Sequence, residues 1–168
     1  EYRPSEHHEL TISKVSEGTS WGAVYAQFFQ PASEMTDAAM GLKVKREVWV
    51  DSTRLADTKV LKIGDKVRIR LTIIADRDYD FVQVTDKRAA CLEPVSQLSG
   101  YHWGYYIAPK DYSTNYYFDS MAKGKHVVET EYYINRAGVY QTGVCTVQCA
   151  YAPEYCGHTG AMRLSVED

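Results

Sequence analysis

The residues with the most obvious chemistry are the four cysteines, Cys91, Cys145, Cys149 and Cys156. In one extended strand, Cys145 and Cys149 point the same way but lie about 13 Å apart at roughly 3.3 Å per residue, beyond the reach of a disulfide. Two pairings remain. We favour Cys91–Cys149 with Cys145–Cys156, because each inward cysteine then bonds to a neighbouring segment, over Cys91–Cys145 with Cys149–Cys156. Disulfides indicate an oxidising compartment, and four buried free thiols are the alternative.

The same cysteines could also be interpreted as a metal site, with the spacing Cys145-x3-Cys149-x6-Cys156-x-His158. Structural zinc sites use closely spaced ligand pairs on a turn, so that both sulfurs converge at about 2.3 Å from one ion. Here Cys145 and Cys149 are spread along a strand with Val147 between them. We therefore expect no metal and no cofactor.

Motifs for catalysis are missing from the sequence. It contains neither G-x-S-x-G nor H-E-x-x-H, and His102 and His126 are isolated. Glu129 and Glu131 alternate on the expected outer face of a strand, so they do not form an acid–base pair. The sequence predicts that the chain is not an enzyme.

Tyrosine is unusually abundant, with 14 Tyr against 4 Phe and 3 Trp. Eleven of the tyrosines fall in the second half of the chain: Tyr101, Tyr105, Tyr106, Tyr112, Tyr116, Tyr117, Tyr132, Tyr133, Tyr140, Tyr151 and Tyr155. Tyrosine combines an apolar ring with a hydrated hydroxyl group and is enriched at interfaces. Tyr132 and Tyr151 lie on apolar strand faces, which favours the core. Trp103, Tyr105, Tyr106 and Tyr155 are candidates for an interface.

Two kinds of partner would suit such aromatic residues. The first is another protein surface. The alternative is a carbohydrate, bound on a stacking platform formed by Trp103, Tyr105 and Tyr106.

The elements that must position these residues are strands, because the hydrophobic residues repeat with a period of two. We expect strands at 21–30, 42–50, 67–73, 81–84, 127–134, 139–151 and 162–166; in 42–50 the apolar face is broken only by Arg46. The segment 98–121 is rich in Tyr, Gly, Ser and Asn, and we expect one long functional loop there. Strands without crossover helices predict an all-β fold, an antiparallel β-sandwich, in a single domain spanning residues 1–168.

Length and charge limit the function classes further. The 168 residues fit one domain, and a net charge of −3 argues against a nucleic-acid partner. No run of 18 apolar residues is present, so we expect no direct membrane insertion. The chain begins at Glu1 without a signal sequence, and we expect it to be a fragment of a larger protein.

Several separate segments resemble the last domain of bacterial alpha-2-macroglobulin-like proteins. They are 62–67 (KIGDKV), 80–84 with 88–94 (DFVQV and RAACLEP), 138–143 (GVYQTG) and 151–154 (YAPE), together with WGAVY at 21–25. The resemblance implies a macroglobulin or immunoglobulin-like sandwich that resembles the receptor-binding domain of the animal proteins. It also implies a position at the C-terminus of a large protease-trapping inhibitor.

The resemblance implies partners and a place as well. The adjacent, thioester-type domain would pack on this one, target proteases would be met through the full-length protein, and the whole would be periplasmic or anchored in the cell envelope. In relatives, bulky residues near the position of segment 150–153 help to shield the thioester from water, so Tyr151 and Pro153 join the interface candidates. The thioester motif Cys-x-Glu-Gln is absent, because Cys91-Leu92-Glu93 is followed by Pro94.

Overall fold

The strands of this chain form one large sheet and one small one. The computed structural model describes residues 11–22, 29–56 and 60–168, and within them the regular structure outside one 3-10 turn, η1 (Ala32–Glu34), is β. The large sheet contains β1 (Ala38–Met40), β2 (Leu42–Val50), β3 (Thr53–Arg54), β5 (Lys66–Ala75), β6 (Tyr79–Lys87), β7 (Leu92–Pro94), β8 (Gly100–His102), β9 (Tyr105–Pro109), β10 (Ser113–Met121), β11 (Gly124–Ile134), β13 (Cys145–Cys149) and β14 (Cys156–His158). The small sheet contains β4 (Leu61–Lys62), β12 (Gly138–Gln141) and β15 (Arg163–Glu167).

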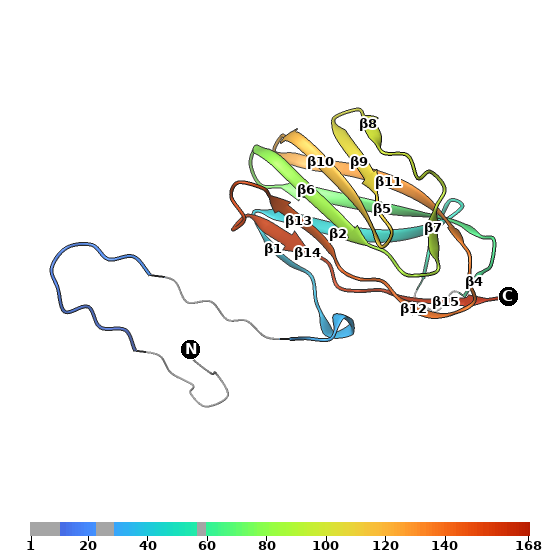
Figure 1. The fold of residues 1–168 in the computed structure, drawn as a ribbon, viewed down its shortest axis with the longest axis horizontal. Coiled ribbons are helices and arrows are strands. Elements are labelled where there is room, and N and C mark those ends of the chain that lie inside the picture. Colours follow the sequence, from blue (N-terminus) through green and yellow to red (C-terminus); the bar gives the residue numbers. More distant parts are fainter. Residues whose placement is uncertain (1–10, 23–28, 57–59) are drawn as a thin grey trace.

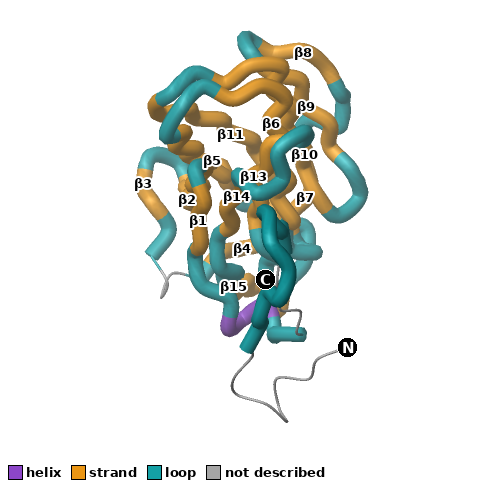
Figure 2. The backbone as a smooth tube through the Cα atoms, turned by 90° about the vertical axis from the view of Figure 1, so that its left-hand side faces the viewer, coloured by secondary structure: helices purple, strands orange, loops and turns teal. Residues whose placement is uncertain are grey.

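The large sheet folds over on itself into two facing layers (Figures 1 and 2). Its strand order is β7-β11-β5-β2-β1-β14-β13-β6-β10-β9-β8, with β3 paired to β2. The layer β7-β11-β5-β2 faces the layer β13-β6-β10-β9-β8, and β1 and β14 join them at one edge. The pairs along this path are antiparallel, whereas β4 and β15 of the small sheet are parallel. The predicted antiparallel β-sandwich is confirmed.

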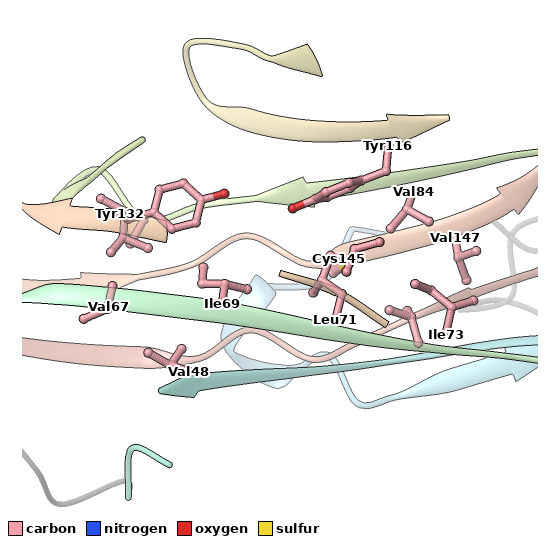
Figure 3. Packing of buried hydrophobic residues seen from close by; sticks show 14 of the residues in the cluster. Val48, Val67, Ile69, Leu71, Ile73, Val84, Tyr116, Tyr132, Cys145 and Val147 are labelled. Carbon is pink, nitrogen blue, oxygen red and sulfur yellow. The ribbon is translucent and has the colours of Figure 1, made fainter. Parts of the chain in front are cut away.

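Alternating side chains build the core between the layers. The burial of β2 alternates strictly along its first half, and β5 buries Val67, Ile69, Leu71 and Ile73 on one face. These side chains meet Val84, Cys145 and Val147 from the opposite layer (Figure 3). The period of two in the sequence therefore identifies the inward face correctly.

Two tyrosines cross this core and tie β10 to β11. The hydroxyl of Tyr132 lies 2.7 Å from Thr114 Oγ1, and the hydroxyl of Tyr116 lies 2.5 Å from Thr130 Oγ1. Both rings are fully buried, and the two hydroxyl groups point toward each other in Figure 3. Burial raises the pKa of both phenols well above the usual value. The prediction that Tyr132 belongs to the core is confirmed.

The expected long loop at 98–121 is wrong. The segment forms β8, β9 and β10, and β10 pairs along its length with β6. Tyrosine is a good strand former, and Tyr116 and Phe118 alternate with Asn115 and Tyr117, a pattern hidden by the polar composition.

The predicted strands at 21–30 and 139–151 have different outcomes. The one at 21–30 falls mostly on residues 23–28, which lie outside the described residues. The one at 139–151 is two strands, β12 and β13, which belong to different sheets.

The edge at which β1 and β14 connect the two layers requires a glycine at position 157. Gly157 lies in β14, opposite Ala39 of β1 and Val147 of β13. A Cβ atom there would lie 2.2 Å from the carbonyl oxygen of Leu42, far inside van der Waals contact. The backbones of β14 and β2 can approach this closely only because position 157 has no side chain.

We predict that Gly157→Ala destabilises the fold by about 2 kcal/mol or more, because backbone atoms must move to admit the methyl group. Gly100→Ala is the matched control, since no heavy atom lies within 4 Å of its added Cβ. Urea unfolding measures both. Equal midpoints for the two variants would contradict the role given to Gly157.

The charged residue that breaks the apolar face of β2 lies at the centre of a buried polar cluster. The Arg46 guanidinium donates to Asp86 Oδ1 at 2.7 Å, Thr142 Oγ1 at 2.6 Å and the carbonyl oxygens of Gly143 at 2.7 Å and Gly160 at 3.1 Å. The side chains of Arg46 and Asp86 are 1% and 0% exposed. Burial raises the pKa of the Asp86 carboxyl, and the charge of Arg46 opposes that rise.

We predict strong coupling between Arg46 and Asp86 in a double-mutant cycle. Arg46→Met or Asp86→Leu alone should cost about 3–5 kcal/mol, because each leaves a buried charge without its partner. The double variant should cost less than the sum by about 1–3 kcal/mol. Urea unfolding of the four proteins gives the coupling, and strictly additive costs would show that the two charges act independently.

Candidate functional site

One end of the layer β13-β6-β10 carries an exposed aromatic surface. β13 ends at Cys149, and the turn before β14 places Tyr151 and Pro153 in solvent, with the Tyr151 side chain 81% exposed. The ring of Tyr151 meets that of Phe81 from β6 edge to face, with centroids 5.2 Å apart and planes at 87°. The core position favoured for Tyr151 is wrong, because the strand alternation stops two residues before it.

Phe81 is a member of this surface that the sequence did not single out. Its φ is +54°, a left-handed conformation that is unusual for a bulky residue. This left-handed residue interrupts the alternation of β6: Tyr79 and Val82 are both buried, while Asp80 and Phe81 between them are exposed. The Phe81 carbonyl accepts the Ala150 amide at 2.8 Å, so β6 is fixed to the turn that carries Tyr151.

Tyr155 anchors the other side of the turn. Its half-buried ring lies 5.4 Å from that of Tyr79, and the Arg77 guanidinium lies over it at 5.0 Å. The Tyr79 hydroxyl donates to Asp76 at 2.6 Å, and burial with this bond raises the pKa of Tyr79 to about 12. The hydrogen bond from Arg77 lowers the pKa of Asp76. We call Phe81, Tyr151, Pro153 and Tyr155 the tip surface.

The β8–β9 hairpin separates the other three aromatic candidates. Trp103 is fully exposed at its turn. Tyr105 packs inward, with its ring 5.9 Å from Tyr116 and 5.4 Å from Phe118, whereas Tyr106 points to the outer face between Tyr101 and Tyr117. Neighbours in a strand point to opposite faces. Trp103, Tyr105 and Tyr106 therefore do not form the single stacking platform considered above.

The cysteines do not form either predicted set of disulfides. Cys156 lies opposite Gln148 in the β13–β14 register, so both face outward, whereas Cys145 and Cys149 face the core. Each predicted set joins Cys156 to one of those two, across the thickness of the sheet. All four cysteines are free thiols. Burial raises the pKa of the Cys91 and Cys145 thiols, which keeps them protonated and poorly nucleophilic.

We predict that alkylation in denaturant without reductant adds a label to all four thiols. In the native state Cys156 should react first, because it is the least buried. Intact mass spectrometry counts the labels. Labelling that reaches four only after reduction would restore the disulfide hypothesis.

The described residues offer little for other chemistry. Among them, no group of three or more His, Cys, Asp or Glu side chains could hold a metal ion. Nor does any helix in that part of the chain have the length and apolar character to cross a membrane. The exposed aromatic side chains form two surfaces of the sandwich: the tip surface and the outer face around Tyr106.

The two-layer fold places the chain among immunoglobulin-like sandwiches of the macroglobulin class. Residues 41–154 match the family model described as the bacterial alpha-2-macroglobulin MG10 domain. The chain therefore belongs to this family. The match starts just before β2 and ends in the turn that carries Tyr151 and Pro153. A comparison with curated protein sequences finds no match.

Solved structures share the fold. A mutant of Salmonella alpha-2-macroglobulin is similar over 82% of this chain and 10% of its own, with TM-score 0.72 and 21% identity. Native Escherichia coli alpha-2-macroglobulin, from domain MG7 to the C-terminus, is similar over 82% of this chain and 25% of its own, with TM-score 0.71 and 19% identity. The C-terminal domain of wzt is similar over 83% of this chain and 83% of its own, with TM-score 0.54 and 13% identity. This chain thus corresponds to a small part of each of the two alpha-2-macroglobulin chains.

Proposed function

We propose that this chain is the non-catalytic terminal domain of a bacterial alpha-2-macroglobulin-like protease-trapping inhibitor. Its task is to pack against the neighbouring, thioester-type domain through the tip surface. The observation that carries this proposal is the Tyr151–Phe81 pair, an exposed aromatic contact built on a left-handed backbone at Phe81. Unfavourable backbone conformations persist where the surrounding structure holds them, and they cluster at functional sites.

The composition of the tip surface suits an interface that forms and opens again. Tyr151 and Pro153 are exposed, while Arg77 and Asp76 form a hydrated charged rim beside Tyr155. Interfaces between domains of one chain are modest in area and relatively polar, so they can change between two arrangements. On this proposal the domain moves with its neighbour when bait cleavage closes the trap.

The chain contributes contacts and no covalent chemistry to trapping. Cys91-Leu92-Glu93-Pro94 lacks the glutamine of a thioester motif, and the Cys91 side chain is fully buried beside β7. Tyr151 is the residue we assign to the contact with the thioester-type domain. Target proteases are met through the full-length protein, and its place is the periplasm or the cell envelope.

The test is Tyr151→Ala in the full-length parent protein. We expect faster protease-triggered closure, and faster methylamine reaction where the parent holds a thioester, by about 2- to 10-fold, because the variant loses an aromatic contact of about 0.5–1.5 kcal/mol. Native gel mobility and methylamine incorporation measure the two rates.

Tyr112→Ala is the matched control, since Tyr112 is 69% exposed and lies outside the tip surface. It should leave both rates unchanged. Parent-like rates in Tyr151→Ala would remove Tyr151 from the interface.

A further inference from the structure

The outer face of the layer β8-β9-β10-β6-β13 carries almost no charge. The cross-strand registers align one row of neighbouring side chains across five strands: Tyr101, Tyr106, Tyr117, Gln83 and Gln148. The next row contains Asn115, Thr85 and Thr146. Lys87 and Asp119 are the exposed charges two residues further along β6 and β10, one on each side of these two rows, and we call the surface between them the neutral face. We propose that the neutral face is a binding site for a neutral polysaccharide chain.

The lack of charge is a property of this face and not of the chain. On the outer face of the opposite layer, Glu129 pairs with Arg70 at 2.5 Å and Arg68 at 3.4 Å, and Lys66 pairs with Glu131 at 2.6 Å. Charged residues make up 24% of the sequence. The two outer faces of the sandwich therefore differ in composition, and the neutral face offers no ion pair to a charged ligand.

The tyrosine end of the row offers ring surfaces. The centroids of Tyr101 and Tyr106 are 4.9 Å apart, and those of Tyr106 and Tyr117 are 6.5 Å apart, with the planes tilted by 69° and 44°. Tyr101 is 80% exposed and Tyr117 37%. The C–H faces of sugar rings pack on aromatic rings, and each phenol adds a hydroxyl donor at the edge.

The other end of the row offers amides and hydroxyl groups. Gln83 Nε2 donates to Thr85 at 3.3 Å and Gln148 Nε2 donates to the Pro153 carbonyl at 3.4 Å, both long bonds. Within the described part of the chain, Oε1 of both glutamines accepts no hydrogen bond. Amide and hydroxyl groups can both donate and accept, as sugar hydroxyl groups require.

A hollow lies among these polar groups. It has a volume of about 260 Å³ and is lined by Gln83, Thr85, Thr146, Gln148 and Ala150. This is slightly below the range of about 300–1,000 Å³ for drug-sized ligands, a size that suits a single sugar ring. A chain with one ring in the hollow would continue along the row over Tyr117 and Tyr106.

Other occupants fit this chemistry less well. A nucleic acid or an anionic lipid surface needs Lys and Arg side chains, which the neutral face lacks. The centre of a protein interface is built on buried aromatic or arginine anchors, whereas the β6 and β13 half of this face consists of amides and hydroxyl groups. A neutral polysaccharide matches both the rings and the amides.

The experiment is affinity electrophoresis of the 168-residue chain in gels containing soluble β-glucan, mannan or dextran, with polygalacturonate as the charged probe. We expect at least one neutral polysaccharide to retard the chain, with little dependence on salt. Tyr106→Ala and Gln83→Ala, on different strands, should each weaken binding by about 2- to 10-fold. Thermal unfolding confirms that each variant folds.

The matched control is Tyr133→Ala, because Tyr133 is 46% exposed on the charged outer face. It should bind like the unaltered chain. The proposal is overturned by lack of retardation in all three neutral gels, by retardation in polygalacturonate alone, or by an equal loss in Tyr133→Ala. Binding by the chain that disappears in the full-length parent would also overturn it, because the face would then be an internal contact. The gel result on the 168-residue chain is scored separately from the Tyr151 test, because it does not need a contact between the tip surface and a neighbouring domain.

Discussion

A single buried guanidinium, that of Arg46, connects parts of the chain that strand pairing leaves apart. It joins β2 to Asp86 of β6 and holds the turns on either side of the β13–β14 hairpin through Thr142, Gly143 and Gly160. A buried charge requires its partners, so these contacts fix where the hairpin begins and ends. The far end of the same hairpin carries Tyr151. The position of the tip surface therefore depends on an ion pair at the opposite end of two short strands.

Tyrosine has three roles here, and the direction of the side chain decides among them. Tyr116 and Tyr132 point inward and link the layers through threonine hydroxyl groups. Tyr106 points outward and forms part of an uncharged row. Tyr151 lies beyond the end of its strand, where the alternation no longer applies. The abundance of one residue type thus reflects a core, a sheet face and a turn.

Much of the fold could be predicted from the period of two, because burial of one sheet face imposes that pattern directly on the sequence. The family, too, was identified correctly from short segments such as 62–67. The strands β8 to β10 were missed because residues such as Asn115 and Tyr117 resemble a loop in composition. Phe81 could not be predicted at all, since a left-handed φ at a phenylalanine leaves no trace in a single sequence. The sequence shows Arg46 as the one charge on the apolar face of β2. Its partner Asp86 on β6 is distant in sequence, so the pair can be found only in the fold.

We propose that the β13–β14 turn is the surface by which this domain meets its neighbour. Hydrogen exchange measured on this chain alone and within the intact parent protein tests it most directly. Amides of residues 150–155 should exchange about tenfold more slowly in the parent, equivalent to about 1.4 kcal/mol of added protection. That protection should change after protease cleavage of the parent, while amides at the far end of β11 stay the same. Equal exchange of residues 150–155 in the chain and in the parent would contradict the claim.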